Sequence, residues 1–499
     1  MLILAVGSAV AIGAKRLGVA YNVALVLVGL VVAVLGVLPR AALDPEVVLV
    51  GMLPVLVFQG ALSTDLDHLK KSRTPILALA IPGVALSLLG TAAVATWALE
   101  LPFAIALVLG ALLAITDTVS VLLAFRAVRV PTRLAAIMEG ESLFNDGTAL
   151  VLVATTASIA ISGTAEPLGV ARSLLLALGG AIGFGLVFGV VGGLVLRATP
   201  DHLTAVLASV VVCFGAALIS ENAHASPVIA VVIVGLFLSH VARRSLPPSR
   251  VLALQSFWEA NVFALNVLIF LLVGMQLDAS ALFAEAPAIL IAFGAMHAGR
   301  ALAVYGSFGA LRLVSKSPVS LKWQHVMVLG NIKGALSMAA VLALPSAVPF
   351  KARLVTIVFG VTFLTLVGQA LPFARILKLL RVVISPADAR VEDARTRLVA
   401  ARSGQAELDT LLAAGLIPRG AHAERMARLQ REALDAERTL RASEMVGGDA
   451  LAHVDLAVLD AQRGALVEAA QRGVLESEAV EQRLAEIDER ILELREKEH

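Results

Sequence analysis

Residues 134–162 of the chain read LAAIMEGESLFNDGTALVLVATTASIAIS. A helix needs about 20 apolar residues to cross a bilayer, so this stretch is long enough to span. It nevertheless carries Glu141 and Asp146 within the apolar run. A charge at the centre of a bilayer costs at least ~2.5 kcal/mol, so both acids are candidate functional residues.

The composition of the whole chain indicates a membrane protein. Of the 499 residues, 59% are hydrophobic and only 16% are charged, and the mean hydropathy is +0.89, whereas soluble proteins are about 25% charged. Long unbroken apolar runs favour helices over a membrane β-barrel, whose strands alternate. The composition therefore predicts an all-α polytopic membrane protein. The two interrupted spans described below are the fifth and the twelfth, a separation that predicts two inverted repeats with one broken helix each.

Charge, cysteine content and the missing motifs argue against several other classes of protein. The net charge of +2 gives no basis for nucleic-acid binding. The single Cys213 offers neither a disulfide framework nor a cysteine metal cluster. We find no phosphate loop, metal-binding histidine helix or nucleophile elbow, so we expect neither an enzyme nor a resident cofactor.

We expect about thirteen membrane spans from the apolar runs. Lys and Arg gather in alternate connections, and the other connections hold only Arg40, Arg172, Lys351 and Arg353. Basic residues stay on the cytoplasmic side of a membrane, so this distribution predicts an N-terminus outside the cell and a C-terminus in the cytoplasm. The membrane we expect is the plasma (inner) membrane. The predicted spans are 1–14, 17–38, 46–62, 75–99, 103–125, 134–162, 167–196, 203–222, 227–242, 255–277, 287–311, 324–346 and 352–374.

A change in composition divides the chain into a transmembrane domain, 1–384, and a helical tail, 385–499. The tail has no apolar run long enough to span, and its apolar residues follow helical spacing. A weak internal repeat predicts two helical hairpins, which turn at Gly415 and Gly473. Such a tail can support dimer assembly, or it can respond to pH or a ligand.

Helical geometry separates the polar residues of 134–162 into two sets. At 100° per residue, Ser142 and Asp146 share one face, while Glu141 and Asn145 share another, about 140° from Asp146. The first face suits a water-filled cavity. Glu141 instead suits a buried ion pair, and Arg300 in span 287–311 is the partner we expect, because an unpaired Arg there would be costly.

Two other spans contain polar interruptions. The run Thr116-Asp117-Thr118 competes with helical backbone bonding in span 103–125. In span 324–346, Gly330 and Gly334 flank Asn331 and Lys333. Both patterns predict broken helices, which present backbone carbonyls and helix ends to ions at the midplane.

Residues 140–147, GESLFNDG, resemble the Asn-Asp motif of monovalent cation:proton antiporters of the sodium/proton exchanger family, NhaP-like branch. Four more segments resemble signatures of that family in the same order, namely Phe58–Ser63, Thr116-Asp117, Phe257–Gly274 and Gly330–Leu336. Three positions depart from the family pattern. Thr118 replaces a usual Pro, Lys333 replaces a usual Arg, and Gln59 stands where related sequences often have Glu.

The resemblance implies a cation and proton site. Asp146 would bind either a proton or a cation, and Asn145 would support its geometry. Asp117, the carbonyl of Thr116 and the hydroxyl of Ser142 would supply further oxygens, as hard monovalent cations prefer.

It also implies roles for the remaining charges. Glu141 and Arg300 would form a structural pair, and Lys333 would compensate the dipoles where the broken helices cross. The family fold implies a homodimer in the lipid bilayer, with a moving core bundle beside a fixed dimerisation bundle.

The function that follows is secondary antiport of H⁺ against a monovalent cation, Na⁺ or Li⁺. One carboxylate visited in turn by both ions makes exchange obligatory, and a single acid in the Asn-Asp pair predicts electroneutral exchange. Exchange of K⁺ for H⁺ is an alternative within the family. A cation channel and a membrane signalling protein with an active tail are alternatives from other classes.

Overall fold

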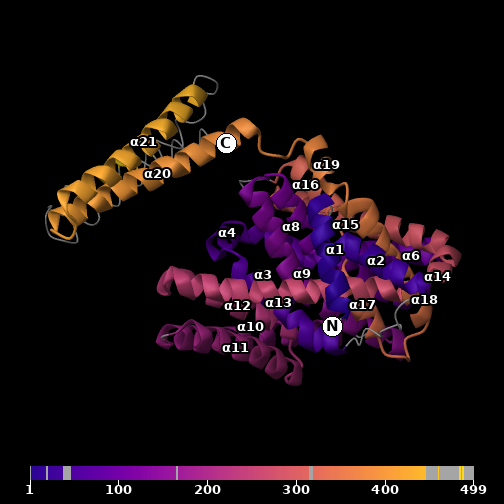
Figure 1. The fold of residues 1–499 in the computed structure, drawn as a ribbon. Coiled ribbons are helices and arrows are strands. Elements are labelled where there is room, and N and C mark those ends of the chain that lie inside the picture. The colour runs from indigo at the N-terminus through magenta and orange to yellow at the C-terminus, as the bar shows by residue number, and fades with distance from the viewer. Residues whose placement is uncertain are drawn as a thin grey trace. The chain divides into compact units, whose positions relative to one another are not determined.

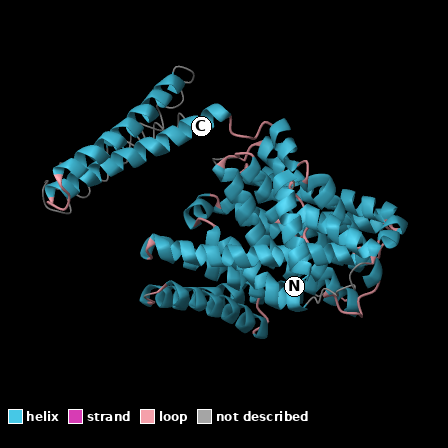
Figure 2. Cartoon of the chain, viewed as in Figure 1, coloured by secondary structure: helices cyan, strands magenta, loops and turns pink. Residues whose placement is uncertain are grey.

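The computed structural model describes residues 2–17, 21–36, 46–164, 167–199, 201–313 and 319–444, together with a few isolated positions beyond them. Every regular element in these ranges is a helix (Figure 2). The chain divides into two compact units, Met1–Val383 and Ile384–His499. The all-α prediction is confirmed.

The first unit contains nineteen of the described α-helices (Figure 1). They are α1 (Leu2–Leu17), α2 (Tyr21–Leu35), α3 (Leu53–Ser63), α4 (Leu66–Lys71), α5 (Arg73–Ala78), α6 (Val84–Ala98), α7 (Phe103–Ala114), α8 (Thr118–Ala127), α9 (Thr132–Ser162), α10 (Pro167–Ala198), α11 (His202–Asn222), α12 (Pro227–Ser245), α13 (Pro248–Gln276), α14 (Ala279–Ala284), α15 (Ala286–Leu311), α16 (Leu321–Leu329), α17 (Ala335–Leu342), α18 (Lys351–Thr365) and α19 (Phe373–Leu379).

The lengths of these helices agree with a protein that crosses a membrane many times. Within the described residues, eight helical segments are long and apolar enough to span, and three more apolar helices are shorter. One of the shorter helices is α7, because the span predicted over 103–125 is interrupted after Ala114. The predicted total of thirteen spans stays a prediction.

Three short π-helical turns join the α-helices. They are η1 (Val47–Met52) before α3, η2 (Leu79–Gly83) between α5 and α6, and η3 (Leu366–Ala370) after α18. Pro82 lies inside η2 and lacks a backbone N–H, so the hydrogen-bond ladder must widen around it.

The spanning helices pack as two bundles. In the first bundle, α1, α2 and α3 pack with α10, α11, α12 and α13, and α2 lies along α13. In the second bundle, α6, α7, α8 and α9 pack with α15, α16, α17 and α18, and α6 lies along α15. Figure 1 shows α10–α13 side by side toward the lower left and α6, α15 and α18 toward the right. Contacts between the bundles include those of α9 with α10 and α12 and of α13 with α17.

Small residues set the closest helix contacts in each bundle. Gly29 of α2 faces Gly274 of α13, and a Cβ atom at either position would collide with backbone atoms of the other helix. Gly90 of α6 and Gly299 of α15 meet in the same way. Helices in lipid gain stability from such close packing, since the surrounding hydrocarbon gives no hydrophobic driving force.

The second unit contains a helical hairpin of α20 (Pro386–Ala413) and α21 (Arg419–Glu444). The Ser385 hydroxyl accepts a hydrogen bond from the Asp388 N–H and caps the start of α20. Gly415 has a φ of +70° in the turn, at the predicted position. The second predicted turn, at Gly473, lies outside the described residues.

Candidate cation and proton site

Two helices of the second bundle are each interrupted, and their interruptions lie next to each other in space. The helix of α7 ends at Ala114 and resumes at Thr118 as α8, while α16 ends at Leu329 and resumes at Ala335 as α17. The N–H of Asp117 donates a hydrogen bond of 2.7 Å to the carbonyl of Ile332. The two interruptions predicted from sequence therefore contact each other directly. We name them the acidic break (residues 115–117) and the basic break (residues 330–334).

The close approach of the two breaks explains one of the glycines. A Cβ atom on Gly334 would lie 2.7 Å from Cβ of Asp117, closer than side chains can approach. The backbone of Gly334 is extended, with φ −134° and ψ −161°. Glycine is therefore required at 334 for space rather than for an unusual backbone conformation.

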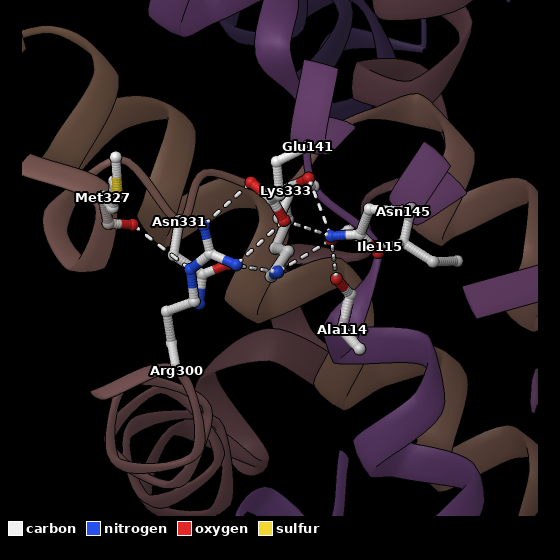
Figure 3. Close-up of polar contacts among 9 residues, drawn as sticks. Ala114, Ile115, Glu141, Asn145, Arg300, Met327, Asn331 and Lys333 are labelled. Atoms are coloured by element: carbon white, nitrogen blue, oxygen red, sulfur yellow. Dashed lines mark hydrogen bonds and ion pairs between the residues drawn. The ribbon is translucent and has the colours of Figure 1, made fainter. Parts of the chain in front are cut away.

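Lys333 joins the basic break to the acidic break. Its Nζ donates hydrogen bonds of 2.7 Å to the carbonyl of Ile115 and to Oδ1 of Asn331 (Figure 3). The side chain is completely buried. Ile115 follows the C-terminus of α7, where the helix dipole is negative, so the ammonium group lies where a positive charge is stabilising.

Glu141 and Arg300 form a bidentate ion pair. Both guanidinium Nη atoms lie 2.9 Å from the two carboxylate oxygens, and Nε of Arg300 donates to the carbonyl of Met327 at 3.2 Å (Figure 3). Both side chains are only 4% exposed. The pair thus connects α9 and α15 to the end of α16.

The side-chain amide of Asn145 donates to three oxygens at or beside the acidic break. Its Nδ2 lies 2.9 Å from Oε1 of Glu141, and 3.3 Å from both the carbonyl of Ala114 and Oγ1 of Thr116. Glu141 and Asn145 therefore share a helix face, as their spacing in the sequence indicates. Figure 3 shows Asn145 between the ion pair and the end of α7.

Asp146 lies on α9, one residue after Asn145 and four after Ser142. Its Oδ1 atom is buried, and no group in the described part of the chain forms a hydrogen bond with it. Asp117, Glu141 and Lys333 are the charged groups that act on it electrostatically. A buried oxygen without a partner is unusual in a native protein and calls for an explanation.

A small pocket opens beside the acidic break. Its lining includes three residues predicted for the cation site, Thr116, Asp117 and Ser142, and both residues of the predicted ion pair, Glu141 and Arg300. Asp146 is not among its lining residues. No set of three or more His, Cys, Asp or Glu side chains in the described residues could hold a metal ion. A cation here would therefore need hydroxyl and carbonyl oxygens in addition to carboxylates.

Two further observations concern Gln59 and the surroundings of Asp117. Gln59 of α3 donates to Oγ of Ser63 in its own helix, at 2.9 Å. Ser120 donates to Asp117, and Asn22 of α2 donates to Ser120. We did not select Asn22 or Ser120 from the sequence, although an Asn inside the apolar span 17–38 is a signal of the kind that marked the other sites.

The crossed, interrupted helices with buried charges at their crossing define a secondary transporter in architecture. The family model described as "Sodium/hydrogen exchanger, transmembrane" matches residues 1–379. The chain belongs to this family, as its sequence motifs predict.

Known relatives agree with this assignment. The chain is 37% identical over 447 residues to the Na⁺/H⁺ antiporter NhaS2 of Synechocystis, a match that covers 88% of this chain and 81% of that protein. It is 34% identical over 393 residues to the Na⁺/H⁺ antiporter ApNhaP of Aphanothece halophytica, covering 77% and 73%. The solved structure of the sodium proton antiporter MjNhaP1 from Methanocaldococcus jannaschii has the same fold, with a TM-score of 0.66 and 23% identity, covering 77% of this chain and 97% of that chain.

Proposed function

We propose that this protein exchanges Na⁺ for H⁺ across a membrane by alternating access, and that the two ions compete for Asp146. The observation that carries the proposal is the buried Oδ1 of Asp146, which has no hydrogen-bond partner among the described residues. A cation would coordinate that oxygen, and a proton would neutralise the buried charge. The relatives NhaS2 and ApNhaP are Na⁺/H⁺ antiporters by name, which supports the same exchange here.

The remaining ligands would come from the acidic break. Asp117, the carbonyl of Thr116 and the hydroxyl of Ser142 would complete an oxygen shell for the cation, and the pocket that these three residues line supports this assignment. Asn145 would hold the acidic break in place through its contacts with Ala114 and Thr116.

We propose structural roles for the other buried charges. Glu141 already has a full-strength partner in Arg300, so it is not available to the cation without breaking a buried ion pair. Lys333 would compensate the carbonyl dipole at the end of α7. With Glu141 neutralised by Arg300, and a neutral Asn145 beside Asp146, exchange of one proton for one cation would be electroneutral.

The placement of the protein is also proposed. The distribution of Lys and Arg supports an inner-membrane protein with its N-terminus outside and the 385–499 tail in the cytoplasm. Family resemblance supports a homodimer in the bilayer. The tail is assigned to assembly or regulation, because residues 1–379 alone match the family model.

The test is ion-driven dequenching of a pH dye in proteoliposomes, with Na⁺, Li⁺ and K⁺ titrated separately. We expect Na⁺ to drive saturable proton movement in the wild type and not in Asp146→Asn. Asp201→Asn is the matched control, because Asp201 is an exposed N-cap of α11 and Asn caps equally well. Full proton-coupled transport by Asp146→Asn would contradict the proposal, and a response to K⁺ alone would assign K⁺/H⁺ exchange instead.

Electroneutrality is tested in the same vesicles with an imposed membrane potential. Movement of one net charge is worth about 2.3 kcal/mol per 100 mV, so an electrogenic cycle would respond strongly. We expect the initial rate to be unchanged by the potential. A rate that depends on the potential would contradict the one-to-one stoichiometry but would not bear on the competition at Asp146. Single-channel currents would indicate a channel instead of an antiporter.

A further inference from the structure

Asn22 is an isolated polar residue in an apolar helix. The sequence of α2 is YNVALVLVGLVVAVL, and Asn22 within it is completely buried. Burial of an amide without hydrogen bonds is costly, and more so at membrane depth. The side chain must therefore have partners, and these identify its role.

The Asn22 amide is fixed in one orientation by two contacts. Its Oδ1 accepts a hydrogen bond of 3.0 Å from the N–H of Val23, so its Nδ2 is the atom that points away from α2. That Nδ2 donates to Oγ of Ser120 at 2.5 Å. Ser120 is itself buried, one turn along α8 from the acidic break.

Ser120 transmits this contact to Asp117. A hydroxyl has one proton to donate, and because the Asn22 N–H approaches the oxygen of Ser120, that proton is directed elsewhere. Oγ of Ser120 donates it to Oδ2 of Asp117 at 2.5 Å. The result is a directed chain from Asn22 through Ser120 to a carboxylate, and hydrogen bonds to charged groups are stronger than neutral ones.

The chain also connects the two bundles. Asn22 belongs to α2, which packs along α13 in the first bundle, whereas Ser120 and Asp117 belong to the interrupted helix of the second bundle. The orientation of one carboxylate oxygen at the acidic break is thus set by a residue outside the bundle that contains the break.

We propose that Asn22 is a positioning residue for cation binding, which acts through Ser120 to orient the carboxylate of Asp117. The proposal rests on the proposed function, because it takes Asp117 as a ligand of the transported cation. Asn22 itself does not contact the cation.

The test measures the Na⁺ dependence of exchange in proteoliposomes for Asn22→Ala, Ser120→Ala and the double variant. Loss of one hydrogen bond in the chain should raise the apparent KM for Na⁺ about three- to tenfold, with the maximal rate within about twofold of wild type. Because both residues act on the same carboxylate oxygen, the double variant should be no worse than Ser120→Ala alone. Asn222→Ala is the matched control, since Asn222 is exposed and donates only to the carbonyl of Leu218 in its own helix.

Three results would overturn the proposal. They are an unchanged KM in Asn22→Ala, a lower maximal rate at unchanged KM, and additive effects in the double variant. If Asn22→Ala does not purify as a folded protein, Asn22→Leu keeps a similar volume and removes the donor without adding a charge, and its KM should rise while Asn222→Leu stays at the wild-type value. Absence of Na⁺/H⁺ exchange in the wild type would instead refute the proposed function, so the two failures are distinct.

Discussion

The acidic break and the basic break lie against each other, yet they are stabilised in different ways. The acidic break has no glycine and no proline, and side chains from outside it, namely Asn145, Ser120 and Lys333, donate hydrogen bonds to its oxygens. The basic break contains two glycines, and its Lys333 reaches out to hold the other break.

This difference teaches which break is suited to a mobile ion. Lys333 is completely buried and both of its contacts are made within the protein. Thr116 and Asp117 instead line a pocket. A charged group whose hydrogen bonds are all made within the protein, such as Lys333, is suited to holding the helices together. Oxygens that line a pocket, such as those of Thr116 and Asp117, are suited to binding an ion that comes and goes. The variants below separate these two roles.

The largest loss of stability is expected at Arg300, which joins the end of α16, just before the basic break, to α9 and α15. Arg300→Met would leave Glu141 buried and unpaired and would remove the contact with Met327 at the end of α16. The free energy of unfolding should fall by about 3–5 kcal/mol, which thermal unfolding of the purified protein measures.

A matched control exists for this substitution. Arg353 also pairs with a carboxylate, Glu285, but their side chains are 37% and 34% exposed. Arg353→Met should therefore cost less than about 1 kcal/mol. Equal losses in the free energy of unfolding for the two variants would show that burial does not make the Glu141–Arg300 pair contribute more to stability than the exposed pair.

The second prediction contrasts the two breaks directly. Lys333→Met would leave the carbonyl of Ile115 and Oδ1 of Asn331 without a donor, at a cost of about 1–3 kcal/mol for each buried acceptor. Asp117→Asn should instead unfold near the wild-type temperature and raise the apparent KM for Na⁺ at least about tenfold, because a charged ligand is lost. The distinction between the breaks fails if Asp117→Asn is the less stable protein of the two.

A third variant tests how closely the breaks must approach. Gly334→Ala would place a Cβ atom 2.7 Å from Cβ of Asp117 and force the breaks apart, costing about 1–3 kcal/mol and raising KM. Gly306→Ala in α15 is the control, since a Cβ there meets nothing within 4 Å. Alanine favours a helix, so Gly306→Ala should gain roughly 0.5–1 kcal/mol. A Gly334→Ala protein with wild-type stability would mean that the breaks separate without cost.

The smallest effect is expected from Thr116→Val. This substitution keeps the shape and the backbone carbonyl but removes the hydroxyl that accepts from Asn145 at 3.3 Å. Loss of one weak hydrogen bond should cost about 0.5–1.5 kcal/mol of stability and change the KM for Na⁺ less than Asp117→Asn does. A KM as high as that of Asp117→Asn would make the Thr116 hydroxyl, rather than its carbonyl, the ligand.

Local sequence was sufficient for much of this fold. Apolar runs predicted helices in the part of the chain that the structure describes as helical, and polar residues inside those runs located both breaks. The pairing of Glu141 with Arg300 followed from the cost of burying either charge alone, and the structure has these groups in contact. Their role as a structural pair stays a prediction.

Other features depend on three-dimensional packing and could not be predicted. The contact between Asn22 and Ser120 joins residues 98 positions apart, and no helical periodicity relates them. The π-helical turns η1 and η3 each end two residues before a proline, Pro54 and Pro372, but a proline alone does not distinguish a π-turn from a kink or a helix end. The pocket beside the acidic break likewise depends on how five segments meet.

The hydrogen bond between the N–H of Asp117 and the carbonyl of Ile332 joins two backbones. Substitutions that leave room for the close approach of the two breaks keep both of these groups, whereas a proline at 117 removes the N–H and a side chain at 334 separates the breaks. Redesign of the polar side chains at the crossing should therefore leave the backbone junction in place as long as position 334 stays glycine.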